Sequence, residues 1–398
     1  MAVPKLRFKD DNRQDYPEWE ENKLGDIGCV MRGLTYKPTD VRDDGIRVFR
    51  SSNISEDTFI YGEDDVFVDV NAVNIPFVQN GDILITAANG SSRLVGKHSV
   101  IHGVLNDTAV HGGFMLLIRS KDSAFINSSM YSSWYKKFVY KFVAGGNGAI
   151  GNLKKSDLEN VHLFVPCEKE KNKINDFLTT VEKRITAQQN IIADLEETKK
   201  GLLQKIFSQE IRFKDDNGQD YPKWETHRLS DYAEYVSSTA CCEAPCYLGT
   251  EDMISNFGGV NIKKSQGNYS GYRFGKNNII LGNIRPYLKK CWISDRQGIC
   301  STDLLVMNVK GIYPEILFMK MCTDEFVIYN MKGAKGTKMP RGDKKHIMNW
   351  TFRLPENGAE QQKIADFLST FDKKITAEKQ VLSDLQEMKK GLLQQMFV

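Results

Sequence analysis

The sequence predicts an α/β fold in two similar halves joined by two long helices, and three observations support this prediction. An opening motif occurs twice, as residues 7–20 and 212–225, at an offset of about 205. A helical motif also occurs twice, as residues 173–207 and 363–397, at an offset of about 190. The bodies between these motifs share almost no identity, yet they keep one order of strands and helices. A period near 200 residues is too long for solenoid repeats of about 20 to 50, so it indicates two whole domains.

The opening motif repeats almost residue for residue. Arg7 to Asn12 return as Arg212 to Asn217, and Trp19-Glu20 return as Trp224-Glu225. Chance does not produce such identity beside bodies that differ so much. Nearly identical flanking motifs around two different bodies indicate two recognition domains for different targets, each held by the same kind of scaffold.

Each body, roughly residues 28–165 and 233–354, predicts the same succession of elements. A turn feeds a buried strand, because turn residues precede a short apolar run. A polar loop, a second strand, an aromatic helical segment, a glycine-rich turn and a closing strand follow. In the two bodies the ranges are 80–86 and 276–281 for the first strand, 113–118 and 303–307 for the second, and 145–148 and 333–336 for the glycine-rich turn, with closing strands that end at Pro166 and Pro355. Matching strands with differing loops are typical of a scaffold that presents recognition loops.

Basic and aromatic residues gather at comparable places in the two bodies. A solvated basic surface explains each group alone, but recurrence in both halves favours contact with phosphate, since Lys and Arg supply most sequence-independent affinity for DNA. For Arg285 a structural role is the alternative, namely an ion pair with a carboxylate such as Asp303 that closes its own loop. The candidate DNA contacts are Asn89, Ser92, Arg93, Lys97, Lys136, Lys137, Arg285, Tyr287, Lys289, Lys290, Lys335 and Lys338.

The end of each half predicts a long helix with a coiled-coil seam. Apolar residues recur at alternating steps of four and three, the heptad period of a left-handed coiled coil. Two such helices in one chain pair most simply with each other, and pairing between two chains is the alternative. Gln188 and Lys199 interrupt the first seam at the register where Glu378 and Lys389 interrupt the second, which fits a role in alignment. The predicted seam residues are Ile174, Leu178, Val181, Ile185, Ile192, Leu195, Leu202 and Ile206, then Ile364, Leu368, Phe371, Ile375, Leu382, Leu385, Leu392 and Met396.

Composition predicts a soluble, cytoplasmic protein. The chain has 398 residues, of which 41% are hydrophobic and 26% charged, as in ordinary globular proteins. Its beginning is charged and has no apolar core of a signal peptide, and no run of about 18 apolar residues occurs. Eight cysteines without regular spacing indicate free thiols in a reducing compartment. The net charge of +3 is too small to identify a nucleic-acid partner by itself.

Enzyme signatures are missing from the sequence. Residues 90–97 only faintly resemble a phosphate-binding loop, because five residues separate the glycines and His98 stands where Ser or Thr should hold magnesium. Glu197-Thr198-Lys199 and its copy lie on the predicted helices without an acidic strand, which argues against a nuclease. Zinc would need a fourth ligand beside the cluster of Cys241, Cys242 and Cys246. We therefore expect neither a catalytic centre nor a metal site.

Taken together, these segments resemble the specificity subunit of a type I restriction-modification enzyme over nearly the whole chain. Two departures from the family pattern are Asn277-Asn278, in place of Gly-Asp, and Lys169 to Asn172, in place of Glu-Gln-Gln before the first helix. The segments that carry the resemblance are Trp19 to Asp26 with Trp224 to Asp231, Gly81 to Leu84, Ile284 to Pro286, Glu360 to Ile364, and Lys199 to Gln204 with Lys389 to Gln394.

The resemblance implies two target-recognition domains, residues 1–166 and 208–355, that alternate with conserved helices at 167–207 and 356–398. The helices would form an antiparallel coiled coil with an internal pseudo-twofold repeat. Each domain would read one half of a bipartite site in double-stranded DNA, while the coiled coil sets the spacer and docks two modification subunits. Restriction subunits would join them.

By the same resemblance the subunit is non-catalytic and holds no cofactor. S-adenosylmethionine, ATP and magnesium are expected on the modification and motor-nuclease subunits. The alternative function is a tandem-repeat coiled-coil scaffold that binds proteins without DNA specificity.

Overall fold

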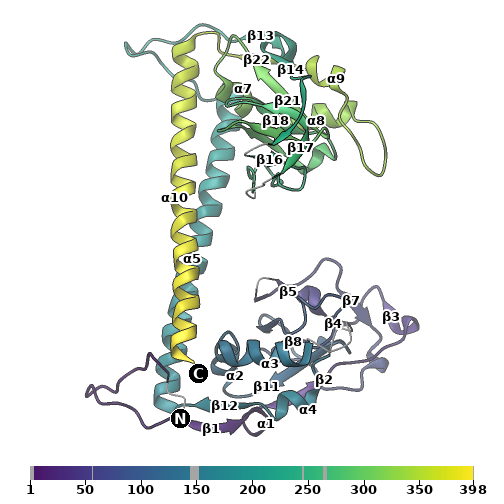
Figure 1. Cartoon of the computed structure of the whole chain (residues 1–398), viewed down its shortest axis with the longest axis vertical. Coiled ribbons are helices and arrows are strands. Elements are labelled where there is room, and N and C mark those ends of the chain that lie inside the picture. The colour runs from purple at the N-terminus through teal and green to yellow at the C-terminus, as the bar shows by residue number, and fades with distance from the viewer. Residues whose placement is uncertain (1–3, 56, 144–151, 244–245, 263–266, 398) are drawn as a thin grey trace. The chain divides into compact units, whose positions relative to one another are not determined.

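The computed structural model describes residues 4–55, 57–143, 152–243, 246–262 and 267–397. Two compact units make up the chain, Met1–Gln188 with Val381–Val398 and then Gln189–Gln380. Each unit holds one body and part of both long helices, α5 (Glu168–Phe207) and α10 (Gly358–Met396) (Figure 1). The predicted mixed α/β fold with two long paired helices is confirmed.

The first body contains two four-stranded sheets. One is antiparallel and has the order β2 (Cys29–Arg32), β11 (Met115–Arg119), β8 (Ile83–Thr86) and β9 (His98–Val100). The other has the order β10 (Ala109–His111), β4 (Ile46–Phe49), β7 (Val66–Val68) and β3 (Val41–Arg42), and its β10 and β4 are parallel. A small hairpin joins β5 (Ile54–Ser55) to β6 (Thr58–Phe59).

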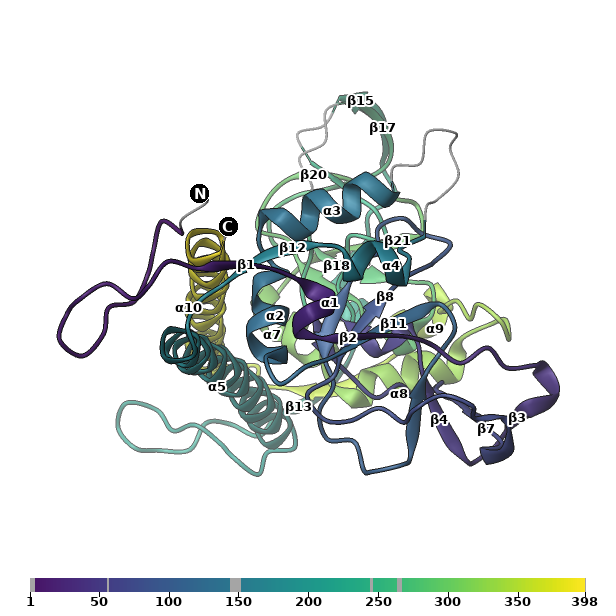
Figure 2. The same ribbon diagram turned by 90° about the horizontal axis from the view of Figure 1, so that it is seen from below.

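Strand β8 is buried on both faces, which explains its continuous apolar sequence. Ile83 and Ile85 pack towards α2 (Ser123–Ser129), α3 (Ser133–Val143) and α4 (Lys155–Glu159). Leu84 lies in a second cluster with Phe49 and Ala109 of the other sheet. Figure 2 shows these helices beside the sheet that contains β8 and β11.

The second body repeats the first sheet and alters the second. Strands β14 (Ala233–Tyr235), β21 (Leu304–Val309), β18 (Ile279–Gly282) and β19 (Cys291–Ile293) follow the same antiparallel order. The other sheet is β15 (Thr239–Glu243), β17 (Asn268–Phe274), β20 (Gly298–Cys300) and β16 (Tyr247–Leu248). Its parallel pair β16 and β20 corresponds to β4 and β10, but here β20 rather than β16 extends the sheet. Helices α7 (Pro314–Met321), α8 (Asp324–Gly333) and α9 (Lys344–Met348) complete this body.

The turns before the equivalent strands β8 and β18 are built alike in spite of different residues. Gly81 has φ +94° and Asn277 has φ +67°, and asparagine is one of the few other residues that tolerates this left-handed conformation. Asp82 accepts a hydrogen bond from the Gln79 N–H at 2.7 Å, as Asn278 does from the Gly275 N–H at 2.7 Å. The departure at residues 277–278 therefore preserves the turn.

The closing strands β12 (His162–Val165) and β22 (Thr351–Leu354) stop directly before Pro166 and Pro355, as predicted. They pair with β1 (Glu20–Lys23) and β13 (Glu225–Arg228), which lead into the short helices α1 (Leu24–Ile27) and α6 (Leu229–Tyr232). The glycine-rich turn expected at residues 145–148 lies outside the described residues, whereas Gly333 of the second turn ends α8.

The long helices run antiparallel within each unit. Every predicted seam residue is buried or partly buried. Lys199 contacts Asp372 at 2.5 Å in one unit, and the equivalent Lys389 pairs with Glu182 in the other. The lysines that interrupt the heptads are thus paired across the two helices.

The opening motif is hydrogen-bonded to the start of the long helix in its own unit, and we call this contact the clasp. Arg7 donates to Glu170 at 2.7 Å and to the carbonyls of Tyr16 and Pro17, and the Trp19 ring N–H donates to Glu170 at 3.0 Å. The second copy repeats the arrangement with Arg212, Trp224 and the buried Glu360. This packing gives a physical reason why the frame, and not the bodies, is duplicated.

Candidate nucleic-acid interface

Four loops of the first body meet at one edge of its two sheets. The strand register brings the end of β8 beside the start of β11, since Thr86 lies opposite Met115, and β4 and β10 end together because they are parallel. The Ala87 N–H donates to the Phe114 carbonyl at 2.9 Å, and the Asn89 side chain donates to Ser51 Oγ at 3.0 Å. We call residues 33–37, 50–53, 87–97 and 112–114 the first basic edge.

The first basic edge contains cationic residues and no Asp or Glu. Its cations are Lys37, Arg50, Arg93 and Lys97. Arg50 donates to the Asp64 carbonyl at 2.7 Å and pairs with the Asp64 carboxylate at 3.7 Å, whereas Arg93 is exposed. An acid-free, cationic set of loops on a rigid sheet is suited to contact with phosphate.

The structure brings the first-body candidates to this edge or beside it. Ser92 and Arg93 are exposed, Lys97 is half-buried, and Asn89 is held by Ser51. Lys136 and Lys137 lie on the exposed face of α3, which flanks the edge. Two contacts fix α3 at this place. The Tyr135 hydroxyl donates to the Gly96 carbonyl at 2.9 Å, and the Val139 side chain packs against Gly96.

Three corresponding loops of the second body, together with residues 335–341 after α8, form a second edge. Residues 283–290 follow β18, and residues 335–341 lie against them because the Arg285 N–H donates to the Pro340 carbonyl at 2.7 Å. Residues 249–253 and 301–303 follow the parallel strands β16 and β20. We call these four segments the second basic edge.

The backbone at the centre of the second basic edge is strained. Arg285 (φ +52°) and Lys289 (φ +55°) are both left-handed and bracket the turn Pro286–Leu288. Such conformations cost about 1 to 3 kcal/mol each and cluster at functional sites. Tyr287 is 48% exposed at the apex of this turn.

Ion pairs occupy some cations of the second basic edge and leave others free. Lys289 contacts Asp324 at 2.6 Å, and this hydrogen bond lowers the pKa of Asp324. Lys335 contacts Asp343 at 2.6 Å, which, with backbone donors, lowers the pKa of Asp343 to about 2. Lys290 donates to the Thr250 carbonyl at 2.7 Å.

An ion pair between Arg285 and Asp303 is not found among the described residues, where Asp303 pairs with Arg341 at 3.1 Å. Within the described part of the chain, the Arg285 guanidinium and the Lys338 ammonium have no ion-pair partner. Both are exposed, so they are available to a ligand.

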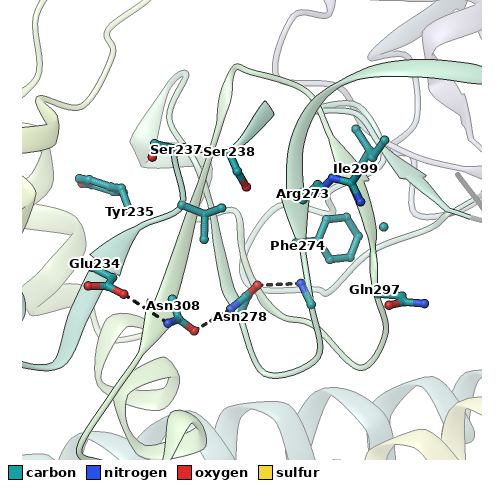
Figure 3. A pocket seen from close by; sticks show the side chains of 13 residues that line it. Glu234, Tyr235, Ser237, Ser238, Arg273, Phe274, Asn278, Gln297, Ile299 and Asn308 are labelled. Atoms are coloured by element: carbon teal, nitrogen blue, oxygen red, sulfur yellow. Dashed lines mark hydrogen bonds between the residues drawn. The ribbon is translucent and has the colours of Figure 1, made fainter. Parts of the chain in front are cut away.

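A polar cavity of about 640 Å³ also lies in the second body, but not at this edge (Figure 3). Glu234, Asn308 and Asn278 form a hydrogen-bonded row along it, with contacts of 3.4 and 3.3 Å. Asn278 precedes β18, whereas the second basic edge follows that strand. The cavity is therefore separate from the candidate interface.

Among the described residues, no group of three or more His, Cys, Asp or Glu side chains could hold a metal ion. Cys241 is exposed and Cys246 is buried, and the Cys242 side chain lies outside the described residues. No helix in the described ranges is long and apolar enough to cross a membrane.

Sequence reasoning missed Lys37, Arg50 and Phe114 as candidate contacts. Lys37 and Arg50 follow β2 and β4, and Phe114 follows β10. The available signal was the absence of acidic residues from these loops. It becomes informative only when the parallel pairing of β4 and β10 is known, since that pairing brings the loops together.

Comparison with known proteins gives one consistent picture. Residues 16–197 and 211–387 each match the family model described as "Type I restriction modification DNA specificity domain". The EcoKI specificity subunit of Escherichia coli strain K12 is 28% identical over 171 residues, covering 41% of this chain and 36% of that protein. The EcoDI specificity subunit of Escherichia coli is 22% identical over 285 residues, covering 61% and 62%. The matched segments thus span less than two thirds of either relative.

A solved structure described as concerning complex assembly and conformational transition of the type I R-M system has a similar fold. Its TM-score is 0.54 at 12% identity, and the match covers 95% of this chain and 97% of that one. At this identity the similarity concerns the fold alone.

Proposed function

The chain belongs to the type I restriction modification DNA specificity family, and we propose that it is the DNA specificity subunit of a type I restriction-modification complex. Each body would read one half of a bipartite DNA site. The subunit would have no catalytic centre of its own.

The observation that supports this proposal most is the pair of basic edges. Three segments of each edge lie at equivalent places, after β4 and β16, after β8 and β18, and after β10 and β20, and their sequences differ completely. Exposed arginine, lysine, serine and asparagine side chains supply the donors that phosphates and base edges accept. Equivalent placement with different residues is what two readers of unlike half-sites require.

The partners follow from the same proposal. Two modification subunits would dock on α5 and α10, whose repeated sequences offer equivalent surfaces in the two units. Motor-nuclease restriction subunits would complete the complex. S-adenosylmethionine would bind the modification subunits, and ATP and magnesium would serve the partner subunits. The division into bodies at 1–166 and 208–355 and helices at 167–207 and 356–398 is part of this proposal.

The test is a binding measurement on the chain assembled with its modification subunits. Mapping methylated bases in cells that carry the system identifies the site, and a duplex with that site is then compared with a scrambled duplex of equal length. We expect about 10³-fold or greater preference for the site at physiological salt. Equal binding to both duplexes would support a protein-binding scaffold instead.

A further inference from the structure

Phe114 is an exposed aromatic residue within the first basic edge. Its side chain is 74% exposed, although large apolar side chains gain most from burial. It stands between β10 and β11, where the loops from β4 and β8 also meet.

The backbone beneath Phe114 is fixed on two sides. Its carbonyl accepts hydrogen bonds from the N–H groups of Ala87 at 2.9 Å and Ala88 at 3.1 Å. On the other side, a Cβ on Gly33 would lie 1.9 Å from the Gly112 carbonyl oxygen, so the segments that follow β2 and β10 approach each other as closely as glycine allows. The loop is thus held in place on both sides, and its Phe114 ring is exposed.

The surroundings of Phe114 indicate which partner would cover it. The first basic edge carries four cations, Lys37, Arg50, Arg93 and Lys97, and its own segments contain no Asp or Glu, although Arg50 pairs with the neighbouring Asp64 at 3.7 Å. An apolar ring among cations matches duplex DNA, in which flat base pairs lie between rows of phosphates. Proteins that deform DNA insert apolar side chains between base steps in this way.

We propose that Phe114 is a wedge that enters the DNA of the half-site read by the first body and stacks against a base there. This inference rests on the proposed function and extends it. The wedge would partly unstack one base step, and the cations around it would hold the flanking phosphates. The step that it deforms would thereby contribute to specificity without a hydrogen bond to a base.

The second body has no such wedge at the equivalent place. Asp303 directly precedes β21, as Phe114 precedes β11, and it pairs with Arg341 at 3.1 Å. Stacking by residue 114 should therefore affect one half-site only.

The test compares Phe114→Ala, Phe114→Trp and the control Leu105→Ala in the chain assembled with its modification subunits. Leu105 is 75% exposed, so its truncation also removes exposed apolar surface. It lies in the loop after β9, at the opposite end of the sheet from residue 87, because β9 runs antiparallel to β8. The probe is the mapped site with 2-aminopurine, which fluoresces when unstacked, placed in turn at positions of each half-site.

We expect Phe114→Ala to weaken binding to the site about 10- to 100-fold, the scale of one lost aromatic stack. The salt dependence should not change, because no charge is removed. Phe114→Trp and Leu105→Ala should bind like the unaltered chain. The 2-aminopurine signal should rise in the first body's half-site with the unaltered chain and stay low with Phe114→Ala.

Unchanged affinity and fluorescence for Phe114→Ala would overturn the wedge while leaving the proposed function intact. Loss of assembly with the modification subunits, measured by mass, would also overturn it and would make Phe114 a protein contact. If the unaltered chain does not prefer the mapped site, the proposed function itself fails, and this result is distinct from both.

Discussion

Two arginines of the second basic edge, Arg285 and Arg341, have side chains in different environments. Arg285 and Arg341 lie on neighbouring segments of the second basic edge, joined by an isolated β-bridge between Ile284 and Arg341. Arg341 pairs with Asp303, and Arg285 is exposed in a left-handed conformation. The first arrangement closes a loop, and the second presents a charge.

We predict that Arg285→Ala weakens DNA binding without lowering stability. If the guanidinium contacts phosphate, the slope of log affinity against log salt should flatten by nearly one unit. If it reads guanine, binding should weaken by about 1 to 3 kcal/mol and discrimination at one position should relax. Isotherms at several salt concentrations measure both effects. Arg341→Ala is the matched comparison, and it should lower the melting temperature because it leaves Asp303 without its partner.

A buried histidine predicts a pH dependence of stability. His111 is 1% exposed, and burial lowers its pKa to about 4. The unfolded chain binds the proton below about pH 6.5 and the folded chain only near pH 4, so stability is complete above 6.5 and falls between these values. The free energy of unfolding should fall by about 3 kcal/mol through this group between these pH values.

His111→Gln should therefore flatten the decline of the melting temperature between pH 6.5 and 4, whereas His102→Gln, at an exposed position, should not. The slope, and not the absolute melting temperature, is the readout. Parallel curves for His111→Gln and the unaltered chain would refute the assignment.

At the scale of elements, the opening motif and the start of a long helix occur as a repeated pair because they contact each other. Glu170 is fully buried at the start of α5, where it accepts hydrogen bonds from Arg7 and Trp19. Each unit therefore ties its opening motif to a helix through one carboxylate.

We predict that Glu170→Ala destabilises the chain by about 3 kcal/mol, because removing one partner leaves a partly buried charge without compensation. Lys169→Ala, at the exposed position directly before Glu170, should leave the melting temperature unchanged. Thermal unfolding measures both, and equal melting temperatures would show that the clasp does not hold the unit together.

These elements also show how far sequence can predict this fold. The helices were predictable because a heptad pattern over about 35 residues is local and redundant, and strands such as β8 stood out as buried apolar runs. The second sheets were not predictable. Their strands are mostly two to five residues long, and the choice between extending β4 or β20 depends on long-range pairing. The positions of Arg50 and Phe114 depend on that pairing, so the sequence indicated Arg93 and not them.

At the scale of the whole molecule, matched frames around different bodies indicate modularity. We predict that replacing residues 28–165 with the corresponding body of a relative changes one half of the methylated site and preserves the other. The physical reason is that the clasp and β1 lie outside the exchanged residues, while the basic edge lies within them, and the new body needs only a closing strand that pairs with β1 as β12 does. Sequencing of methylated bases before and after the exchange measures this. Changes in both half-sites would contradict it.

The last prediction concerns the long helices as a ruler. Helices α5 and α10 both contribute residues to each unit, so residues inserted after Gln188 and after Gln380 lengthen the connection between the bodies. Four residues in each helix add about one turn and 6 Å. Because duplex DNA rises about 3.4 Å per base pair, the non-specific gap in the site should grow by about one to two base pairs. Methylation mapping measures the gap.

An insertion in α5 alone is the control, and it should abolish specific binding because the paired lysines Lys199 and Lys389 can no longer both meet their partners. A fully active double insertion with an unchanged gap would show that the helices hold partners but do not set the spacing.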